Sequence, residues 1–152
     1  MTIPVTIQKL IADFPLGFVA TIDKLGRPAV SPKGTFLVLD DRTIAFGNIR
    51  SPGTVENLRA RSDTEVNFID VLKRKGARLR GQARILDAAS SERETHLPKW
   101  RAVWGDLAER ITDIVVIDVE AVKPLATPPY DDGATEEEMI ATYKSKLAGM
   151  YL

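Results

Sequence analysis

The sequence predicts a mainly β protein with helices, in which about six strands, mostly antiparallel, form a barrel and the helices lie at its periphery. Short apolar runs alternate with polar residues at a period of two, most cleanly over residues 77–86. Turn sequences such as Asp23 to Gly26 separate neighbouring runs. The chain has 152 residues, a length typical of one domain, so a single domain over 1–152 is expected.

The first third of the chain should hold one helix and three strands. Apolar residues recur at helical spacing over 6–14, which predicts an amphipathic helix that ends at Pro15. Strands are expected over 18–22, 29–39 and 43–47. Gly26 is able to adopt a positive φ in the first turn. The second strand is expected to bend near Pro32 and Gly34, and proline places it at an edge or a bulge because it cannot donate to the ladder.

The rest of the chain continues the same alternation of strands and helices. Ser51 and Pro52 predict a helix start, with the serine as N-cap and a helix over 52–60 whose Val55 and Leu58 face inward. Strands are expected over 65–71, 77–86 and 113–122. The segment 90–110 is helical or irregular.

The C-terminal segment carries a second helix-start signal. Thr135 and Glu138 form a capping-box pattern, which predicts a helix over about 135–150. One stripe of that helix is apolar and consists of Met139, Ile140, Tyr143, Leu147 and Met150. A loop is expected before it, over 127–133.

Composition excludes several classes of site. There are 21 basic and 21 acidic residues and no cysteine, so the chain has no global attraction to anionic partners and no disulfide or thiolate metal site. His96 is the only histidine, and no metal site is expected around it. The apolar runs are too short for a membrane span, and the N-terminus lacks the features of a secretion signal. A cytoplasmic protein is therefore expected.

Two segments carry residues suited to an anionic ligand. Ser31, Pro32 and Lys33 lie on the second strand. Because Pro32 interrupts the hydrogen-bonded ladder, backbone groups there could meet the edge of a planar ring, and Lys33 would add a positive charge. The alternative is a solvated lysine on a bent strand. Polar residues also gather around the 52–60 helix start: Asn48, Arg50, Ser51, Thr54 and Asn57. Free N–H groups there favour an anion, and Arg50 would add a bidentate contact. The alternative is plain capping by Ser51.

A basic stretch holds six cations and no acid within residues 73–84: Lys73, Arg74, Lys75, Arg78, Arg80 and Arg84. It would suit a nucleic acid backbone or a small phosphate, but a solvated hairpin offset by the acidic segment 131–138 is the usual outcome. No aromatic residue lies among the cations, which makes nucleic acid a less favoured partner. Trp100 and Trp104 share a helix face, and we expect them to pack rather than to stack on a ligand.

The order of these elements resembles the pyridoxamine 5'-phosphate oxidase-like, FMN-binding split-barrel family. The matching pieces cover about residues 16–86: LGFVATIDKLGRPAVSPKG, IAFGNIRSPGTVENL, VNFID and ARLRGQARIL. The resemblance implies a split β-barrel homodimer that binds FMN in two grooves at the subunit interface. It places Ser31, Pro32 and Lys33 along the isoalloxazine, and Gly47 and Asn48 near its other edge. It places Arg50, Ser51 and Thr54 at the phosphate, and Arg78 and Gln82 on a strand bordering the flavin.

The chain also departs from the family pattern. Relatives that oxidise pyridoxamine phosphate carry a basic pair after the serine equivalent to Ser51, whereas Pro52 and Gly53 stand here. Their C-terminal tryptophan-and-arginine segment is replaced by the 135–152 helix. A substrate other than pyridoxamine phosphate is therefore expected, and no catalytic acid or base is predicted. An FMN-dependent oxidoreductase is the leading hypothesis. The alternatives are an F420-dependent reductase and a non-enzymatic module that binds flavin or nucleic acid.

Overall fold

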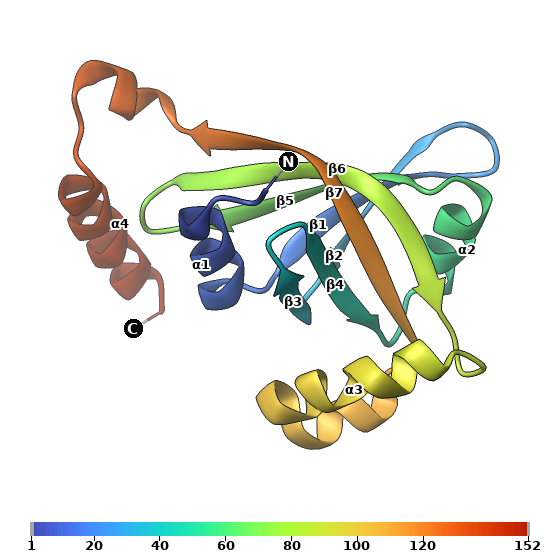
Figure 1. Ribbon diagram of the computed structural model, residues 1–152. Helices are drawn as coiled ribbons and strands as arrows, with labels where there is room; N and C mark the ends of the chain where they lie inside the picture. The colour runs from blue at the N-terminus through green and yellow to red at the C-terminus, as the bar shows by residue number, and fades with distance from the viewer. Residues whose placement is uncertain (1, 152) are drawn as a thin grey trace.

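The computed structural model describes residues 2–151 and consists of one seven-stranded sheet with four α-helices around it (Figure 1). The strands are β1 (Gly17–Ile22), β2 (Pro28–Lys33), β3 (Phe36–Asp40), β4 (Thr43–Asn48), β5 (Asp63–Asp70), β6 (Lys75–Leu86) and β7 (Asp113–Ala126). The helices are α1 (Val5–Asp13), α2 (Pro52–Ala60), α3 (Ser91–Trp104) and α4 (Glu136–Tyr151), with 3₁₀ helices at Gly105–Arg110 and Pro128–Asp132. None of the helices within residues 2–151 is both long enough and apolar enough to span a membrane.

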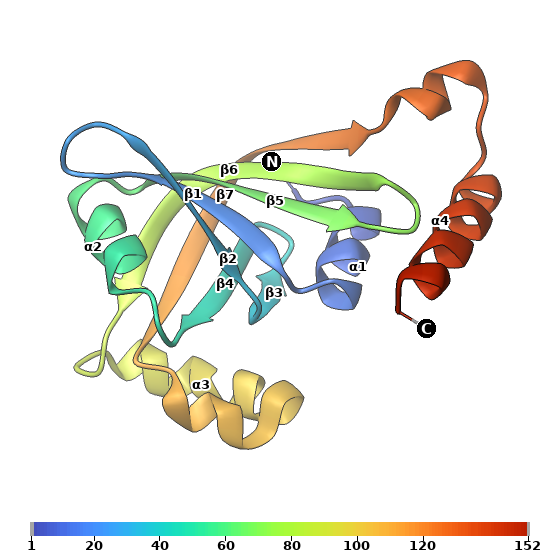
Figure 2. The same cartoon turned by 180° about the vertical axis from the view of Figure 1, so that it is seen from behind.

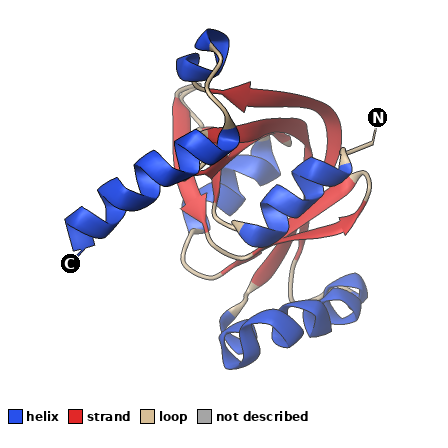
Figure 3. Ribbon diagram, turned by 90° about the vertical axis from the view of Figure 1, so that its left-hand side faces the viewer, coloured by secondary structure: helices blue, strands red, loops and turns tan. Residues whose placement is uncertain are grey.

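The strand order β2-β1-β5-β6-β7-β4-β3 makes β2 and β3 the two edges of the sheet, and every pairing is antiparallel. Only Gly34 and Thr35 separate these two edge strands along the chain. Because two residues reach less than about 11 Å, the edges must lie near each other and the sheet must curl. The strands therefore form a barrel that is not closed by a ladder (Figure 3), which confirms the predicted split barrel.

The predicted strand over 29–39 is wrong as a single element, which raises the strand number from about six to seven. The chain leaves β2 after Lys33 and starts β3 at Phe36, on the opposite edge of the sheet. Thr35 stabilises the crossing, since its carbonyl accepts a hydrogen bond from Trp100 Nε1 at 2.8 Å. The break falls at the bend that was expected near Pro32 and Gly34, but no local pattern shows that the chain passes there to the opposite edge of the sheet.

The two longest strands, β6 and β7, are longer than predicted and pair with each other along the barrel wall. β6 and β7 pair from Lys75 with Ala126 to Leu86 with Ile114. The predicted alternation on β6 is confirmed, because Leu79 is buried whereas Arg80 is exposed. Both strands extend beyond 77–86 and 113–122 because their additional residues pair with each other.

The core divides into two clusters on the two sides of the sheet. Inside the barrel, α1 contributes Ile7 and Ile11 to a cluster that includes Phe36, Phe46 and Phe68. The ring centroids of Phe36 and Phe68 lie 4.8 Å apart in an edge-on arrangement. The other cluster lies between β4, β7 and the α3 segment, and it consists of Ala45, Leu86, Leu97, Trp100, Ala108, Ile111, Ile114 and Val116. Trp100 is fully buried and Trp104 packs against it, so the packing role predicted for both tryptophans is confirmed.

α4 stands beside the barrel rather than on it (Figures 1 and 2). Its predicted capping box is confirmed, since Thr135 Oγ1 accepts from the Glu138 N–H at 3.2 Å and Glu138 Oε2 accepts from the Thr135 N–H at 3.4 Å. Of the apolar stripe, only Met139 is buried, and Met150 is 67% exposed. Ile140, Tyr143 and Leu147 are half-buried, so the stripe is only partly covered within the described protomer.

Candidate functional site

A cavity of about 370 Å³ lies at the corner where β4 gives way to α2. Its lining comes from β4, α2 and the start of β7, and consists of Asn48, Ile49, Ser51, Pro52, Val55, Glu56, Arg59, Thr112 and Asp113. This corner is where the sequence predicted an anion cradle. Of the predicted residues, the fold brings Asn48 and Ser51 into the cavity wall.

Asn48 is the buried polar residue of this corner. Its side chain is 4% exposed, and its Oδ1 has no hydrogen-bond partner among the described residues. Its backbone is fixed, because its carbonyl accepts from the N–H and the hydroxyl of Thr112 at 3.0 and 3.1 Å. A buried polar atom left unpaired costs about 1–3 kcal/mol, so a ligand that donates a hydrogen bond to this oxygen would be favoured.

The first turn of α2 faces the same corner with little side-chain capping. Ser51 occupies the N-cap position and Pro52 the first helical position, as predicted, but the Ser51 hydroxyl makes no capping hydrogen bond. The prediction of a serine side-chain cap is therefore wrong: the backbone at φ −129° and ψ 70° does not carry the hydroxyl onto the helix N–H groups. Thr54 is buried beside this turn and Arg50 is exposed before it. These N–H groups remain suited to an anion.

Five residues of the cavity lining were missed by sequence reasoning: Ile49, Glu56, Arg59, Thr112 and Asp113. Arg59 Nη2 lies 3.6 Å from Asp113 Oδ1. The sequence holds a signal for Arg59, because Ser51, Val55 and Arg59 follow each other at spacings of four on one helix. The sequence holds no such signal for Asp113, because only the pairing of β4 with β7 brings Asp113 next to Asn48.

Lys33 lies inside the protein and not in solvent. The residue is 6% exposed, and its Nζ has no hydrogen-bond partner among the described residues. The ammonium lies 5.8 Å from the ring centroid of Phe46 on the facing strand β4. Burial lowers the pKa of Lys33, because the charged form loses its hydration. The alternative of a solvated lysine is therefore wrong.

The sheet register separates the predicted residues onto two faces. Pro32, Phe18, Asn67 and Arg78 lie opposite one another across β2, β1, β5 and β6, and they form one row on the outer face. Ser31 belongs to the neighbouring row with Val19, Val66 and Leu79, which are fully buried on the inner face. Of the residues expected along the isoalloxazine, Pro32 therefore faces outward and Ser31 faces the inside of the barrel.

Gln82 and Arg78 already have partners on the outer face. The Gln82 amide donates to Asp63 Oδ1 at 2.7 Å, and its Oε1 accepts from the Ser62 hydroxyl at 2.6 Å. Arg78 Nε lies 4.0 Å from Glu65 Oε2. Both residues lie on β6, and neither lines the corner cavity.

Gly47 and Asn57 make contacts that hold the scaffold together. A Cβ at Gly47 would lie 2.5 Å from Ile111 Cδ1, so a larger residue there would force the Ile111 side chain to move. The Asn57 amide donates to the Thr21 hydroxyl at 3.0 Å and ties α2 to β1. These contacts give both residues a structural reason to be where they are.

The basic stretch on the β5–β6 hairpin is largely neutralised by acids. Arg80 Nη2 lies 2.7 Å from Glu65 Oε1, and Lys73 and Lys75 both contact Glu136. Hydrogen bonds between Arg84 and Glu92 raise the pKa of the arginine and lower the pKa of the carboxyl. Little positive charge is left for a polyanion. Within residues 2–151, no group of three acidic or histidine side chains is arranged to hold a metal ion.

Comparisons with known proteins agree with this architecture. The family model described as pyridoxamine 5'-phosphate oxidase matches residues 3–126. No curated protein matches the sequence. HupZ from Group A Streptococcus is 26% identical, with 82% of this chain and 95% of that chain covered and a TM-score of 0.71.

Two further solved structures share the fold at lower identity. An FMN-binding protein from Syntrophomonas wolfei is 14% identical, with 80% of this chain and 84% of that chain covered and a TM-score of 0.66. An F420 reductase is 17% identical, with 80% and 97% covered and a TM-score of 0.62. The family match spans well over half of the chain and includes the strands and the helix start that build the corner cavity. This chain therefore belongs to the pyridoxamine 5'-phosphate oxidase family.

Proposed function

We propose that this chain is an FMN-binding flavoprotein that acts as an oxidoreductase on a substrate other than pyridoxamine phosphate. The observation that carries the proposal is the corner cavity, where a buried amide without a partner stands beside an uncapped helix start. A phosphate would find N–H donors at the start of α2. The unpaired Oδ1 of Asn48 would accept a hydrogen bond from a hydroxyl or N–H group of the cofactor, outside its phosphate.

The phosphate contacts would come from the segment around the start of α2. The N–H groups of Gly53 and Thr54 belong to the first helical turn, and the Ser51 hydroxyl is not used in capping. Arg50 is exposed immediately before them and would reach an anion from solvent. These groups would take the role of the basic pair that pyridoxamine phosphate oxidases carry after the equivalent serine, where this chain has Pro52 and Gly53.

The ring side would be formed by Ser31, Pro32 and Lys33 on β2. When bound, FMN would supply the redox chemistry, and the protein would supply position and electrostatics. Lys33 stands in a buried setting, where one positive charge acts more strongly than in water. Its ammonium would favour an anionic ligand group beside β2. No side chain of this set is assigned as an acid or a base.

We further propose that the working unit is a homodimer, with a second copy on the outer face of β2, β1 and β5. That face exposes an apolar group that a lone protomer leaves in water: Leu16 at 49%, Phe18 at 43%, Val30 at 66%, Ile69 at 37% and Val71 at 50%. In a dimer, Arg78 and Gln82 would border the cofactor of the neighbouring copy. The cytoplasm is the proposed compartment, in keeping with a chain without cysteine.

F420 is the second candidate cofactor, and the structural similarity to an F420 reductase supports it. The same fold would then hold a deazaflavin. A flavin-binding protein without catalysis is the remaining alternative. Titrating FMN and F420 in parallel, with fluorescence as the readout, separates the first two candidates. Reduction of the bound cofactor by a panel of electron donors then separates the enzyme from the carrier.

The first experiment is an absorbance spectrum of the purified protein, followed by heat release and identification of any flavin. We expect flavin bands and FMN in the supernatant, or saturable FMN binding by protein purified without it. Asn48→Asp adds a carboxylate to a corner already lined by Glu56 and Asp113, and should weaken FMN binding at least tenfold. A protein that binds neither cofactor contradicts the proposal.

A further inference from the structure

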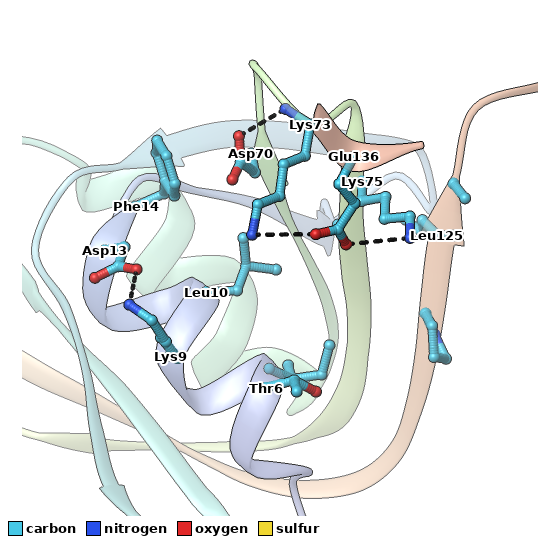
Figure 4. Close-up of a pocket in the computed structure, with 14 residues that line it drawn as sticks. Thr6, Lys9, Leu10, Asp13, Phe14, Asp70, Lys73, Lys75, Leu125 and Glu136 are labelled. Atoms are coloured by element: carbon cyan, nitrogen blue, oxygen red, sulfur yellow. Dashed lines mark hydrogen bonds and ion pairs between the residues drawn. The ribbon is translucent and has the colours of Figure 1, made fainter. Parts of the chain in front are cut away.

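A second and larger cavity, of about 540 Å³ (Figure 4), lies beside α1 and α4, at the end of the protomer opposite α2 (Figure 1). It is bounded by α1, the β5–β6 turn, the end of β7 and the start of α4. None of the residues expected at the flavin lines it. Its volume falls within the range of about 300–1,000 Å³ that is usual for small-molecule sites.

The walls of this cavity are apolar on two sides. α1 supplies Ile7, Leu10 and Phe14, and the end of β7 supplies Pro124 and Leu125. The spacing of these residues in the sequence indicates only an amphipathic helix and a strand end, and no function was expected of them. Such walls favour a ligand with a hydrocarbon body.

The rim of the cavity is charged, and one carboxylate on it stands out. Lys75 Nζ and Lys73 Nζ lie 3.3 and 3.7 Å from the two carboxylate oxygens of Glu136 (Figure 4). The hydrogen bond from Lys75 and the charge of Lys73 lower the pKa of Glu136. Glu136 comes from α4, whereas both lysines come from the β5–β6 hairpin.

The other charges of the lining are satisfied within their own elements. Lys9 pairs with Asp13 one turn away on α1 at 2.6 Å. Asp70 accepts hydrogen bonds from the backbone N–H groups of Leu72 and Lys73. Without Glu136, the lining would hold three lysines and two aspartates. Its net charge would then be +1, which one anionic ligand group would neutralise.

Glu136 is held in place weakly. Both lysines and the glutamate are about two-fifths to one-half exposed, and exposed ion pairs contribute little to stability. α4 buries only Met139. Another carboxylate can therefore replace that of Glu136 without unfolding the barrel.

We propose that this cavity binds an apolar monocarboxylate, such as a medium-chain fatty acid, whose carboxylate takes the place of Glu136 between Lys73 and Lys75. The hydrocarbon chain then lies against Leu10, Phe14 and Leu125. Binding of this ligand breaks the ion pairs that join Glu136, at the start of α4, to the β5–β6 hairpin. The site is independent of the proposed flavin site.

The test is calorimetric titration of the full chain with decanoate below its micelle concentration, with decanol as the uncharged probe. Glu136→Gln removes the competing charge and should tighten decanoate binding about twofold to fivefold, the range of an exposed ion pair. The double variant Lys73→Gln/Lys75→Gln should weaken it at least fivefold. Lys24→Gln, at the distant β1–β2 turn, is the matched control and should match wild type.

A second measurement on wild-type protein does not depend on variants. Proton contacts from bound decanoate should reach the side chains of Leu10 and Phe14 in nuclear Overhauser spectra. Contacts confined to other residues overturn the proposal. Equal decanoate affinity in all four proteins would also overturn it, as would an affinity for decanol equal to that for decanoate. The same holds if Glu136→Gln protein has a native circular dichroism spectrum but shows no saturable binding of decanoate.

Discussion

The hydroxyl of Thr35 bridges both backbone groups of Gly47, donating to its carbonyl at 2.8 Å and accepting from its N–H at 3.0 Å. This side chain continues the β3–β4 ladder for one residue beyond Phe36, where the main chain has turned away toward β2. The bridge is buried, and it lies at the connection between the two edges of the barrel.

Replacing Thr35 with valine should destabilise the fold, because two buried backbone groups of Gly47 lose their partner while the side-chain shape is kept. We expect a loss of about 1–3 kcal/mol in the free energy of unfolding, measured by urea denaturation. Thr142→Val, at an exposed position of α4, is the control and should change it by less than about 0.5 kcal/mol. Equal effects of the two substitutions would show that the bridge contributes nothing.

Gly47→Ala should also destabilise the protein, because its new Cβ would stand 2.5 Å from Ile111 Cδ1. The expected cost is about 1–3 kcal/mol from overpacking. Ile111→Val removes that δ-carbon, so the double variant should recover part of the loss relative to the sum of the single variants. Strict additivity in the denaturation experiment would contradict this contact.

Lys33→Met should make the protein more stable at neutral pH. Burial lowers the pKa of Lys33 in the folded state, so the unfolded chain binds more protons and the stability of the wild type rises as pH approaches the unfolded value of 10.5. The advantage of methionine should therefore shrink between pH 7 and pH 10.5. Urea denaturation across this range checks the trend, with exposed Lys24→Met as the control. A difference that is constant with pH would show that Lys33 keeps an ordinary pKa.

Arg50→Ala should weaken FMN binding by about 1.5–3 kcal/mol if the guanidinium makes a charge-assisted contact with the phosphate. Fluorescence titration measures the dissociation constant. Arg61→Ala, an exposed arginine at the other end of α2, should leave it unchanged. The same dissociation constant for Arg50→Ala and wild type rejects the phosphate role.

Phe18→Glu should turn a dimer into a monomer, because it places a charge in the centre of the proposed apolar interface. Sedimentation velocity over a range of protein concentrations measures the assembly state. Val103→Glu on α3, which replaces a side chain that is 59% exposed, is the control. A wild-type protein that sediments as a monomer at all concentrations removes the dimer from the proposal.

The sequence was most informative where local rules act alone. The alternation over 77–86 revealed the exposed and buried faces of β6, and Thr135 with Glu138 revealed the start of α4. Gly26 has the predicted positive φ, at +80°. These features depend on neighbours within a few residues, so one short stretch of sequence contains all the information needed.

Other predictions needed contacts between distant segments. The Ser51 hydroxyl does not cap α2, and Arg59 with Asp113 joins the corner cavity although the sequence analysis named neither. The predicted strand over 29–39 divides at Gly34 and Thr35, where the Thr35 carbonyl accepts a hydrogen bond from Trp100 of α3, 65 residues later. No local pattern reports such a partner.

By itself, the sequence determined the β-rich class, most helix and strand positions, and the corner at which polar residues gather. Only the tertiary structure decided that Lys33 is buried, that Pro32 and Ser31 face opposite sides, and that β2 and β3 stand at opposite edges of one curled sheet. The physical reason is that periodicity and capping are properties of adjacent residues, whereas burial and strand order depend on which distant segments pack together.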